Sequence, residues 1–204
     1  MLMSHRGLER SVLNVGGHDR SIALPPPYAG WRHVLLDIDP KGRPDVVCDA
    51  RRLTELPGAE YDAVYCSHNL EHYYRHDVAR VLAGFHHVLK ADGVAHIRVP
   101  DMGALMRTVV EKNLDIDDFL YESPAGPITV RDVIYGYGVE IEASGEDFYA
   151  HKTGFTQKSL LTVLDRAGFH SCFVSAQALE IQTLAFKAPP NEYFVRLFEL
   201  AGPP

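Results

Sequence analysis

The stretch YDAVYCSHNLEHYYRHDVARVLAGFHHVLKADGVAHIRV, residues 61–99, decides the fold of this chain. It contains two apolar runs, Tyr61 to Cys66 and Val94 to Val99, rich in the β-branched and aromatic residues that strands favour. Between them, Asp77 to Lys90 carries an apolar stripe at helical spacing, and Asp92-Gly93 is a typical helix stop. Strand, helix and strand in this order predict one unit of a parallel sheet.

The same alternation extends outward on both sides of this stretch. Five further runs have strand character: Val12 to Val15, His33 to Ile38, Asp45 to Cys48, His170 to Ser175 and Leu179 to Lys187. A second helix is predicted over Ser159 to Ala167, with Thr156 as its cap. Too few residues separate the last two runs for a parallel crossover, so they predict a hairpin at the sheet edge. The fold class is therefore α/β, an open twisted sheet of about seven strands, mostly parallel, with an antiparallel C-terminal hairpin.

The length of 204 residues predicts one domain over residues 1–204. Residues 102–155 interrupt the alternation within it. Met102 to Asn113 is predicted to be a helix, whereas Leu114 to Phe155 mixes acidic residues, glycine and short aromatic runs without a period. Long insertions of this kind usually cover active sites or are disordered, and the aromatic content favours a cover.

Charge and cysteine content restrict the partners. Twenty Lys and Arg against 27 Asp and Glu leave a formal charge of −7, which disfavours non-specific nucleic-acid binding. Three widely spaced cysteines, Cys48, Cys66 and Cys172, form no C-x-x-C motif and suit a reducing compartment. The charged start MLMSHRGLER does not resemble a signal peptide, and no run is long enough to span a membrane. We expect a soluble cytoplasmic protein with no membrane or nucleic-acid partner.

Ligands of open α/β sheets bind at the carboxyl ends of the strands. The residues there are Gly16-Gly17 after the first strand, Asp37-Ile38-Asp39 after the second, Asp49-Ala50 after the third and Ser67-His68 after the fourth. Glycine lets a ligand approach the backbone, and a carboxylate can accept both hydroxyl groups of a ribose. These residues predict a nucleoside site.

The turn after the first strand indicates which nucleoside. It lacks the G-x-G-x-x-G motif, and Pro25 to Pro27 prevent the helix whose N-terminus would bind phosphates. The binding of a nucleoside without phosphate groups, such as S-adenosylmethionine, depends least on that missing helix N-terminus.

With these features the sequence resembles the class I S-adenosylmethionine-dependent methyltransferases, specifically the small bacterial type 11-like group with a shortened first helix region. The resemblance rests on six stretches in order: VLNVGG (Val12 to Gly17), GWRHVLLDIDP (Gly30 to Pro40), VVCDARRL (Val46 to Leu53), YDAVYCSHNLEHY (Tyr61 to Tyr73), VLKADGVAHIRVPD (Val88 to Asp101) and AHKTGFTQKSLLTVLDRAGF (Ala150 to Phe169). It implies a Rossmann-like sheet and S-adenosylmethionine as cofactor.

The resemblance also implies roles for the residues at the strand ends. The implied contacts are the methionine part for Gly16 and Gly17, the ribose for Asp37 with Ile38 beside it, the adenine for Asp49 and the backbone of Ala50, and the methyl-donor pocket for Ser67 and His68. Two features depart from the family pattern. Asn14 replaces the usual acidic residue of the first strand, and the two glycines are contiguous.

The expected activity is in-line transfer of a methyl group to oxygen, nitrogen or carbon of a small-molecule acceptor. Because the sulfonium group is already activated, the protein must mainly align the reactants. His72 and His151 are candidate bases, with Glu71 as their orienting partner, and no metal is expected. A C-terminal run of apolar residues at helical spacing, from Tyr193 to Leu200, fits either the core or a homodimer surface.

Four alternatives stay open at this point. Gly16-Gly17 could form only a tight turn, and Asp49 could cap a turn onto Arg51 or Arg52. The chain could be a nucleoside-binding or interaction protein that kept the fold without catalysis. Finally, residues 68–72 match the H-x-x-E-H pattern of a zinc hydrolase, with His68 and His72 as ligands and Glu71 as base.

Overall fold

The computed structural model describes residues 9–124 and 126–200. Its main sheet has the strand order β3-β2-β1-β4-β5-β9-β8. The strands are β1 (Ser11–Val15), β2 (Arg32–Asp37), β3 (Val46–Val47), β4 (Tyr61–Ser67), β5 (Leu89–Pro100), β8 (Ser171–Gln177) and β9 (Glu180–Phe186). Neighbours among the first five are parallel, whereas β9 is antiparallel to both β5 and β8. The α/β fold with an antiparallel C-terminal hairpin is therefore confirmed.

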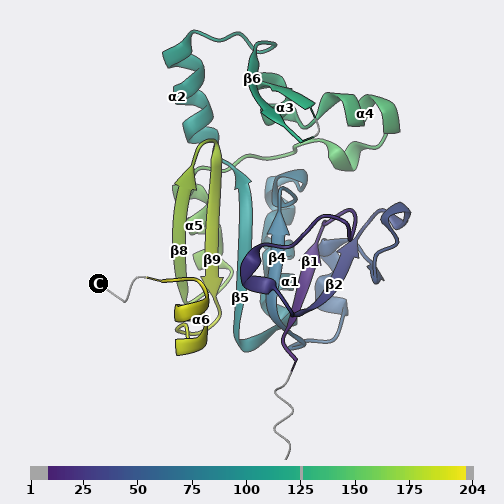
Figure 1. The fold of residues 1–204 in the computed structure, drawn as a ribbon, viewed down its shortest axis with the longest axis vertical. Helices are drawn as coiled ribbons and strands as arrows, with labels where there is room; N and C mark the ends of the chain where they lie inside the picture. The colour runs from purple at the N-terminus through teal and green to yellow at the C-terminus, as the bar shows by residue number, and fades with distance from the viewer. Residues whose placement is uncertain (1–8, 125, 201–204) are drawn as a thin grey trace, which may run out of the picture.

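Two different layers cover the faces of this sheet (Figure 1). On one face, α1 (Arg75–Val88), α5 (Gln157–Arg166) and the 3-10 helix η3 (Ala50–Glu55) enclose the larger core. On the other face, the short 3-10 helix η1 (Pro26–Tyr28) and α6 (Glu192–Leu197) supply an aromatic cluster around the fully buried Phe194. As predicted, the chain between β1 and β2 contains only this 3-10 turn, because consecutive prolines cannot continue a helix.

The end of α1 differs from the prediction. The helix stops at Val88, and β5 begins at Leu89, so Asp92-Gly93 lies inside a strand. The helix ends at Val88 because the segment before β4 binds there: the N–H of Glu60 donates to the carbonyl of Val88 at 2.9 Å. Lys90 then forms an ion pair with Asp62 at 2.8 Å, which fixes the start of β5 beside β4.

Residues 102–155 contain more regular structure than their sequence indicates. They form α2 (Met102–Lys112), the hairpin β6 (Phe119–Ser123) and β7 (Gly126–Thr129), α3 (Val130–Tyr135) and α4 (Gly138–Ser144). A small core of Leu105, Ile128 and Val133 holds these elements together. They gather beyond one end of the sheet, where β5 ends and the turn between β8 and β9 lies (Figure 1).

Short 3-10 helices complete the described ranges: η2 (Pro40–Gly42), η4 (Leu70–His72) and η5 (Asp147–Tyr149). Among the helices within residues 9–124 and 126–200, none has the length and apolar character required to cross a membrane.

Candidate active site

A cavity of about 400 Å³, here called the strand-end cavity, opens at the carboxyl ends of β1, β2 and β4. Five of the eight residues predicted to contact a cofactor line it: Gly16, Asp37, Ile38, Asp49 and His68. The other three, Gly17, Ala50 and Ser67, are adjacent in sequence to lining residues but do not form its wall. Parallel strands bring these segments together because their carboxyl ends meet at one edge of the sheet.

The two glycines after β1 have different surroundings. Gly16 has a left-handed backbone with φ of 71°, and a Cβ there would lie 2.1 Å from Nδ2 of Asn69. A Cβ on Gly17 would lie 2.1 Å from Nδ2 of Asn14. Gly16 therefore belongs to the cavity, whereas Gly17 makes room for the amide that replaces the usual acidic residue.

Asp37 ends β2 with its carboxylate in the cavity wall, although the residue is only 8% exposed. Its Oδ2 accepts the backbone N–H of His18 and its Oδ1 accepts that of Asp39, both at 2.9 Å. Each carboxylate oxygen has a second lone pair. Asp37 can thus accept one more hydrogen bond at each oxygen, in a fixed orientation.

Asp49 serves its own turn as well as the cavity wall. Its Oδ1 accepts the backbone N–H of Arg51 at 2.9 Å, and its Oδ2 pairs with the Arg51 guanidinium at 2.5 Å. Burial would raise the pKa of Asp49, but these bonds from Arg51 lower it. The alternative of a turn cap is therefore what the structure shows, with Asp49 still facing the cavity.

Several residues of the cavity wall had no role assigned from the sequence. Asn69 lies next to His68, and its Oδ1 is buried without a hydrogen-bond partner among the described residues. Phe148 and Lys152 come from the end of the insertion, about 80 residues further along the chain. The position of Asn69 just after β4 was a usable signal, whereas the insertion gave only its aromatic content.

A second cavity of about 720 Å³, here called the insert cavity, lies on the other side of His68. Its wall combines the end of β5, the start of β9 and the insertion, and includes Tyr121, Ile128, Val133, His151 and Leu179. His68 lines both cavities, and His72 lines the strand-end cavity.

His68 is the charged centre of this boundary. Its Nε2 lies 2.8 Å from Oε2 of Glu180, and its Nδ1 lies 3.5 Å from Oε1 of Glu71. Burial would lower the pKa of His68, but these two carboxylates raise it to about 9. Arg98 holds Glu180 from the other side at 2.9 Å. His68 is consequently favoured as a cation, which is hydrogen-bonded to Glu180 through Nε2 and faces Glu71 with Nδ1.

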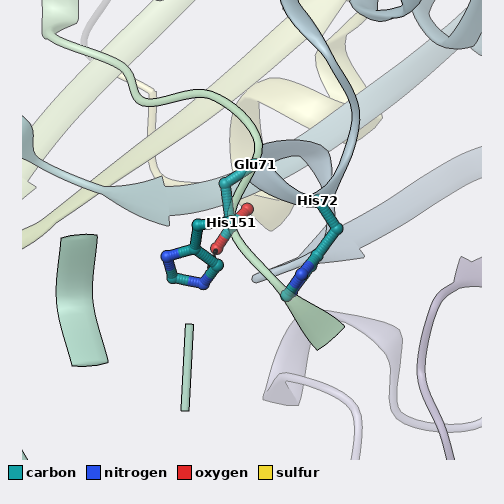
Figure 2. A group of neighbouring side chains, drawn as sticks. All are labelled: Glu71, His72 and His151. Carbon is teal, nitrogen blue, oxygen red and sulfur yellow. Dashed lines mark ion pairs between the residues drawn. The ribbon is translucent and has the colours of Figure 1, made fainter. Parts of the chain in front are cut away.

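The three predicted catalytic residues are brought together (Figure 2). Glu71 and His72 lie in η4, and His151 lies on the chain returning from the insertion, where the N–H groups of Lys152 and Thr153 donate to the carbonyl of Glu71 at 2.8 and 3.1 Å. The rings of His72 and His151 are 4.9 Å apart, and Nε2 of His151 is 4.0 Å from Oε1 of Glu71. Burial would raise the pKa of Glu71, but His68, His72 and His151 lower it, so the carboxyl is ionised.

A family model described as "Methyltransferase domain" matches residues 22–97. These residues run from the turn before β2 to the middle of β5, and they include Asp37, Asp49 and His68. The matched segment is a little over a third of the chain. No curated protein matches the chain significantly.

Solved structures share the fold of this chain at low identity. A SAM-dependent methyltransferase from Archaeoglobus fulgidus is 16% identical, with a TM-score of 0.56, and the match covers 88% of this chain and 86% of that one. A methyltransferase from Methanosarcina mazei is 17% identical, with a TM-score of 0.57 and coverages of 88% and 92%. A 1,6-didemethyltoxoflavin-N1-methyltransferase from Burkholderia thailandensis, solved with 1,6-didemethyltoxoflavin and S-adenosylhomocysteine, is 20% identical, with a TM-score of 0.50 and coverages of 88% and 71%.

S-adenosylhomocysteine is bound in the Burkholderia thailandensis structure, and the residues of the strand-end cavity here fit a nucleoside of this kind. Asp37 offers one unused acceptor position on each oxygen, which suits the two ribose hydroxyls. Gly16 has no space for a side chain, because a Cβ there would collide with Asn69. The buried Oδ1 of Asn69 has no hydrogen-bond partner among the described residues, so it can accept a hydrogen bond from a ligand. The volume of about 400 Å³ lies within the range of small-ligand pockets.

The zinc-hydrolase alternative does not fit the geometry of the methyltransferase domain. Its H-x-x-E-H pattern needs an α-helix that places both histidines on one face. Here η4 has three residues, His68 precedes it with a left-handed φ of 47°, and both ring nitrogens of His68 face carboxylates. His68 and His72 therefore do not form a ligand pair.

Proposed function

We propose that the methyltransferase domain transfers the methyl group to oxygen, nitrogen or carbon of a small-molecule acceptor, with the donor in the strand-end cavity and the acceptor in the insert cavity. The observation that carries this proposal is that the two cavities share a wall. His68 faces both cavities, and the contacting rings of His72 and His151 line one cavity each. A methyl group passing between the cavities has to cross at this point.

The donor supplies a methyl group on a positively charged sulfur, which is already a good leaving group. In the strand-end cavity, Asp37 would hold the ribose and Asp49 would lie beside the adenine, with Ile38 and the backbone of Ala50 next to them. Gly16 and His68 would contact the methionine end, while Gly17 and Ser67 would support that part of the wall from behind. The contribution of these residues is alignment of the donor.

The insert cavity supports a small and largely apolar acceptor. Most of its wall comes from residues 102–155, which we propose act as the cover that excludes water from the reaction. Its wall also carries polar groups, among them the ion-paired His68, Arg98 and Glu180. The toxoflavin-precursor methyltransferase with the same fold was solved with a small heterocycle bound, which supports an acceptor of this size class.

Proton transfer from the acceptor is assigned to the cluster of Glu71, His72 and His151. A hydroxyl or amine in the insert cavity would meet His151 first, and His72 lies against that ring. Backbone carbonyls orient the two rings, that of Val133 for His151 and those of Ala150 and His68 for His72, and Glu71 supplies a negative charge beside His151. An imidazole is suited to accept a proton near neutral pH.

We also propose that the protein works in the cytoplasm without a nucleic-acid partner, which the net charge of −7 and the free Cys48, Cys66 and Cys172 support. Only part of the apolar run from Tyr193 to Leu200 is available as a homodimer surface. Phe194 is fully buried within its own chain, whereas Tyr193 is 39% exposed.

The test uses the purified protein with S-adenosylmethionine carrying a labelled methyl group and fractions of a small-molecule extract. Mass spectrometry is expected to find a labelled product below about 1 kDa, the scale of ligands for cavities of this size, and none with Asp37→Asn. Binding of S-adenosylhomocysteine without any labelled product in any fraction would favour the non-catalytic alternative instead.

A further inference from the structure

The carboxylate of Glu71 lacks partners for its burial. The residue is 1% exposed, and neither of its oxygens has a hydrogen bond among the described residues. The nearest cation is His68, whose Nδ1 is 3.5 Å away and whose other nitrogen is bonded to Glu180. A buried carboxylate normally has hydrogen bonds or a coordinated metal, because its desolvation is costly.

His151 presents a lone pair to this carboxylate. Its Nδ1 lies 3.0 Å from the carbonyl oxygen of Val133, which can only accept, so the ring proton is on Nδ1. In the neutral ring, Nε2 then carries a lone pair and faces Oε1 of Glu71 at 4.0 Å. Two acceptors thus face each other with no hydrogen between them. Histidine ligands of metals typically have this arrangement, with the second N–H donated to a backbone carbonyl.

His72, when its ring is neutral, also has one nitrogen with a lone pair and no donor beside it. Its two ring nitrogens lie 3.2 Å from the carbonyl oxygen of Ala150 and 3.1 Å from that of His68. A neutral imidazole can donate to one carbonyl only, so the other nitrogen has a lone pair with no donor beside it. The potential ligand atoms of Glu71, His72 and His151 all lie within 4.8 Å of one another (Figure 2).

We propose that Glu71, His72 and His151 form a binding site for one divalent transition-metal cation, of which Zn²⁺ is the probe. Two imidazoles and one carboxylate on one side of a cation match sites for such metals that keep open positions, whereas Ca²⁺ and Mg²⁺ prefer all-oxygen ligands. Ligand bonds of about 2.1 Å place neighbouring ligand atoms roughly 3 to 3.5 Å apart. The three side chains therefore need to close by about 1 Å around the ion.

The cation would deepen the proposed function, on which this role in catalysis rests. It would lie between the strand-end cavity and the insert cavity, with its open positions available to a hydroxyl acceptor. Binding to the cation would weaken the acceptor O–H bond, the proton would pass to the Glu71 oxygen that does not bind the cation, and the acceptor oxygen would keep the electron pair that makes it a nucleophile. The two imidazoles would then act as ligands, and the cation takes over the task assigned above to a histidine base.

The experiment measures Zn²⁺ binding by the full chain, purified without a polyhistidine tag and stripped of metal, in competition with a chromogenic chelator. The variants are Glu71→Gln and His151→Gln, each checked for folding by circular dichroism. His170→Gln is the matched control, because His170 is exposed, directly precedes the edge strand β8, and its ring lies 2.7 Å from the hydroxyl of Ser171. S-adenosylhomocysteine binding is measured separately on each metal-free protein by calorimetry.

We expect one Zn²⁺ per wild-type chain, affinity lowered roughly 100-fold or more in Glu71→Gln and in His151→Gln, and no change in His170→Gln. Absence of stoichiometric Zn²⁺ binding, or equal affinity in the folded variants, overturns the metal site and leaves Glu71 held by His68 alone. If S-adenosylhomocysteine binds but Zn²⁺ does not, only the metal site fails. If Zn²⁺ binds but S-adenosylhomocysteine does not, the proposed function fails and the metal site stands.

Discussion

Replacing Asp37 by Asn tests the most specific contact assigned to the methyl donor. The two carboxylate oxygens each accept one backbone N–H at 2.9 Å, which fixes the side chain and leaves one acceptor position per oxygen for the ribose. In Asp37→Asn one of these oxygens becomes an NH₂ group. That group cannot accept a hydroxyl hydrogen, and it faces the N–H of His18 or Asp39.

The expected loss follows from these contacts. A hydrogen bond to a charged group contributes about 1.5 to 3 kcal/mol. Losing one bond to the ribose and the negative charge that strengthens the other costs about 3 kcal/mol of binding free energy, which is roughly 100-fold in Kd.

The assay is calorimetric titration of S-adenosylhomocysteine into both proteins, with Asp45→Asn as the matched control. Asp45 accepts the N–H of Leu35 at 2.7 Å, so this control loses a similar support of β2 outside the strand-end cavity. We expect Asp45→Asn to bind like the wild type. A Kd for folded Asp37→Asn within threefold of the wild-type value would refute the assignment of the ribose to Asp37.

Three further predictions concern the glycine turn, the aromatic layer and pH. Gly16→Ala is expected to abolish donor binding in calorimetry, because its Cβ would lie 2.1 Å from Asn69 and the backbone is left-handed. Phe194→Ala is expected to lower the free energy of unfolding by about 3 to 5 kcal/mol in urea denaturation while donor affinity persists, since the ring is fully buried away from the cavity. Burial and Arg98 lower the pKa of His96 to about 4. The unfolded chain, with an ordinary value near 6.5, therefore binds a proton first, and stability falls by about 2 kcal/mol from pH 7 to pH 5. His96→Gln removes that part of the pH dependence.

Each of these expectations has a contrary outcome. Normal donor affinity in Gly16→Ala would mean that the turn adapts and does not shape the cavity. A loss below about 1 kcal/mol in Phe194→Ala would mean that α6 is only loosely attached. If the unfolding free energy of His96→Gln falls between pH 7 and pH 5 by as much as that of the wild type, groups other than His96 cause the acid sensitivity.

Local sequence signals predicted the sheet well. The strand, helix and strand of residues 61–99 are all present, because a long apolar stripe and two short apolar runs have distinct periods. The hairpin and helices of residues 114–155 were not predicted. Helices of six and seven residues are too short to show a stripe, and their stability depends on distant packing such as Leu105 against Ile128 and Val133.

The residues of the candidate site also include some that local sequence signals could locate and some that they could not. Gly16, Asp37 and Asp49 could be located because each follows a strand, and parallel strand ends share one edge. The partners of His68 and Glu71 could not, since Glu180 lies 112 residues from His68 and His151 reaches Glu71 only after the whole insertion. Contacts of this kind depend on tertiary placement and leave no local pattern.

The most direct test of the account is a crystal structure of the protein grown with S-adenosylhomocysteine. We predict that the ribose hydroxyls lie within about 3 Å of the Asp37 carboxylate oxygens, with the sulfur turned toward His68 and the insert cavity. Electron density for the ligand anywhere outside the strand-end cavity, or with the sulfur facing away from His68, would contradict the proposed path of the methyl group.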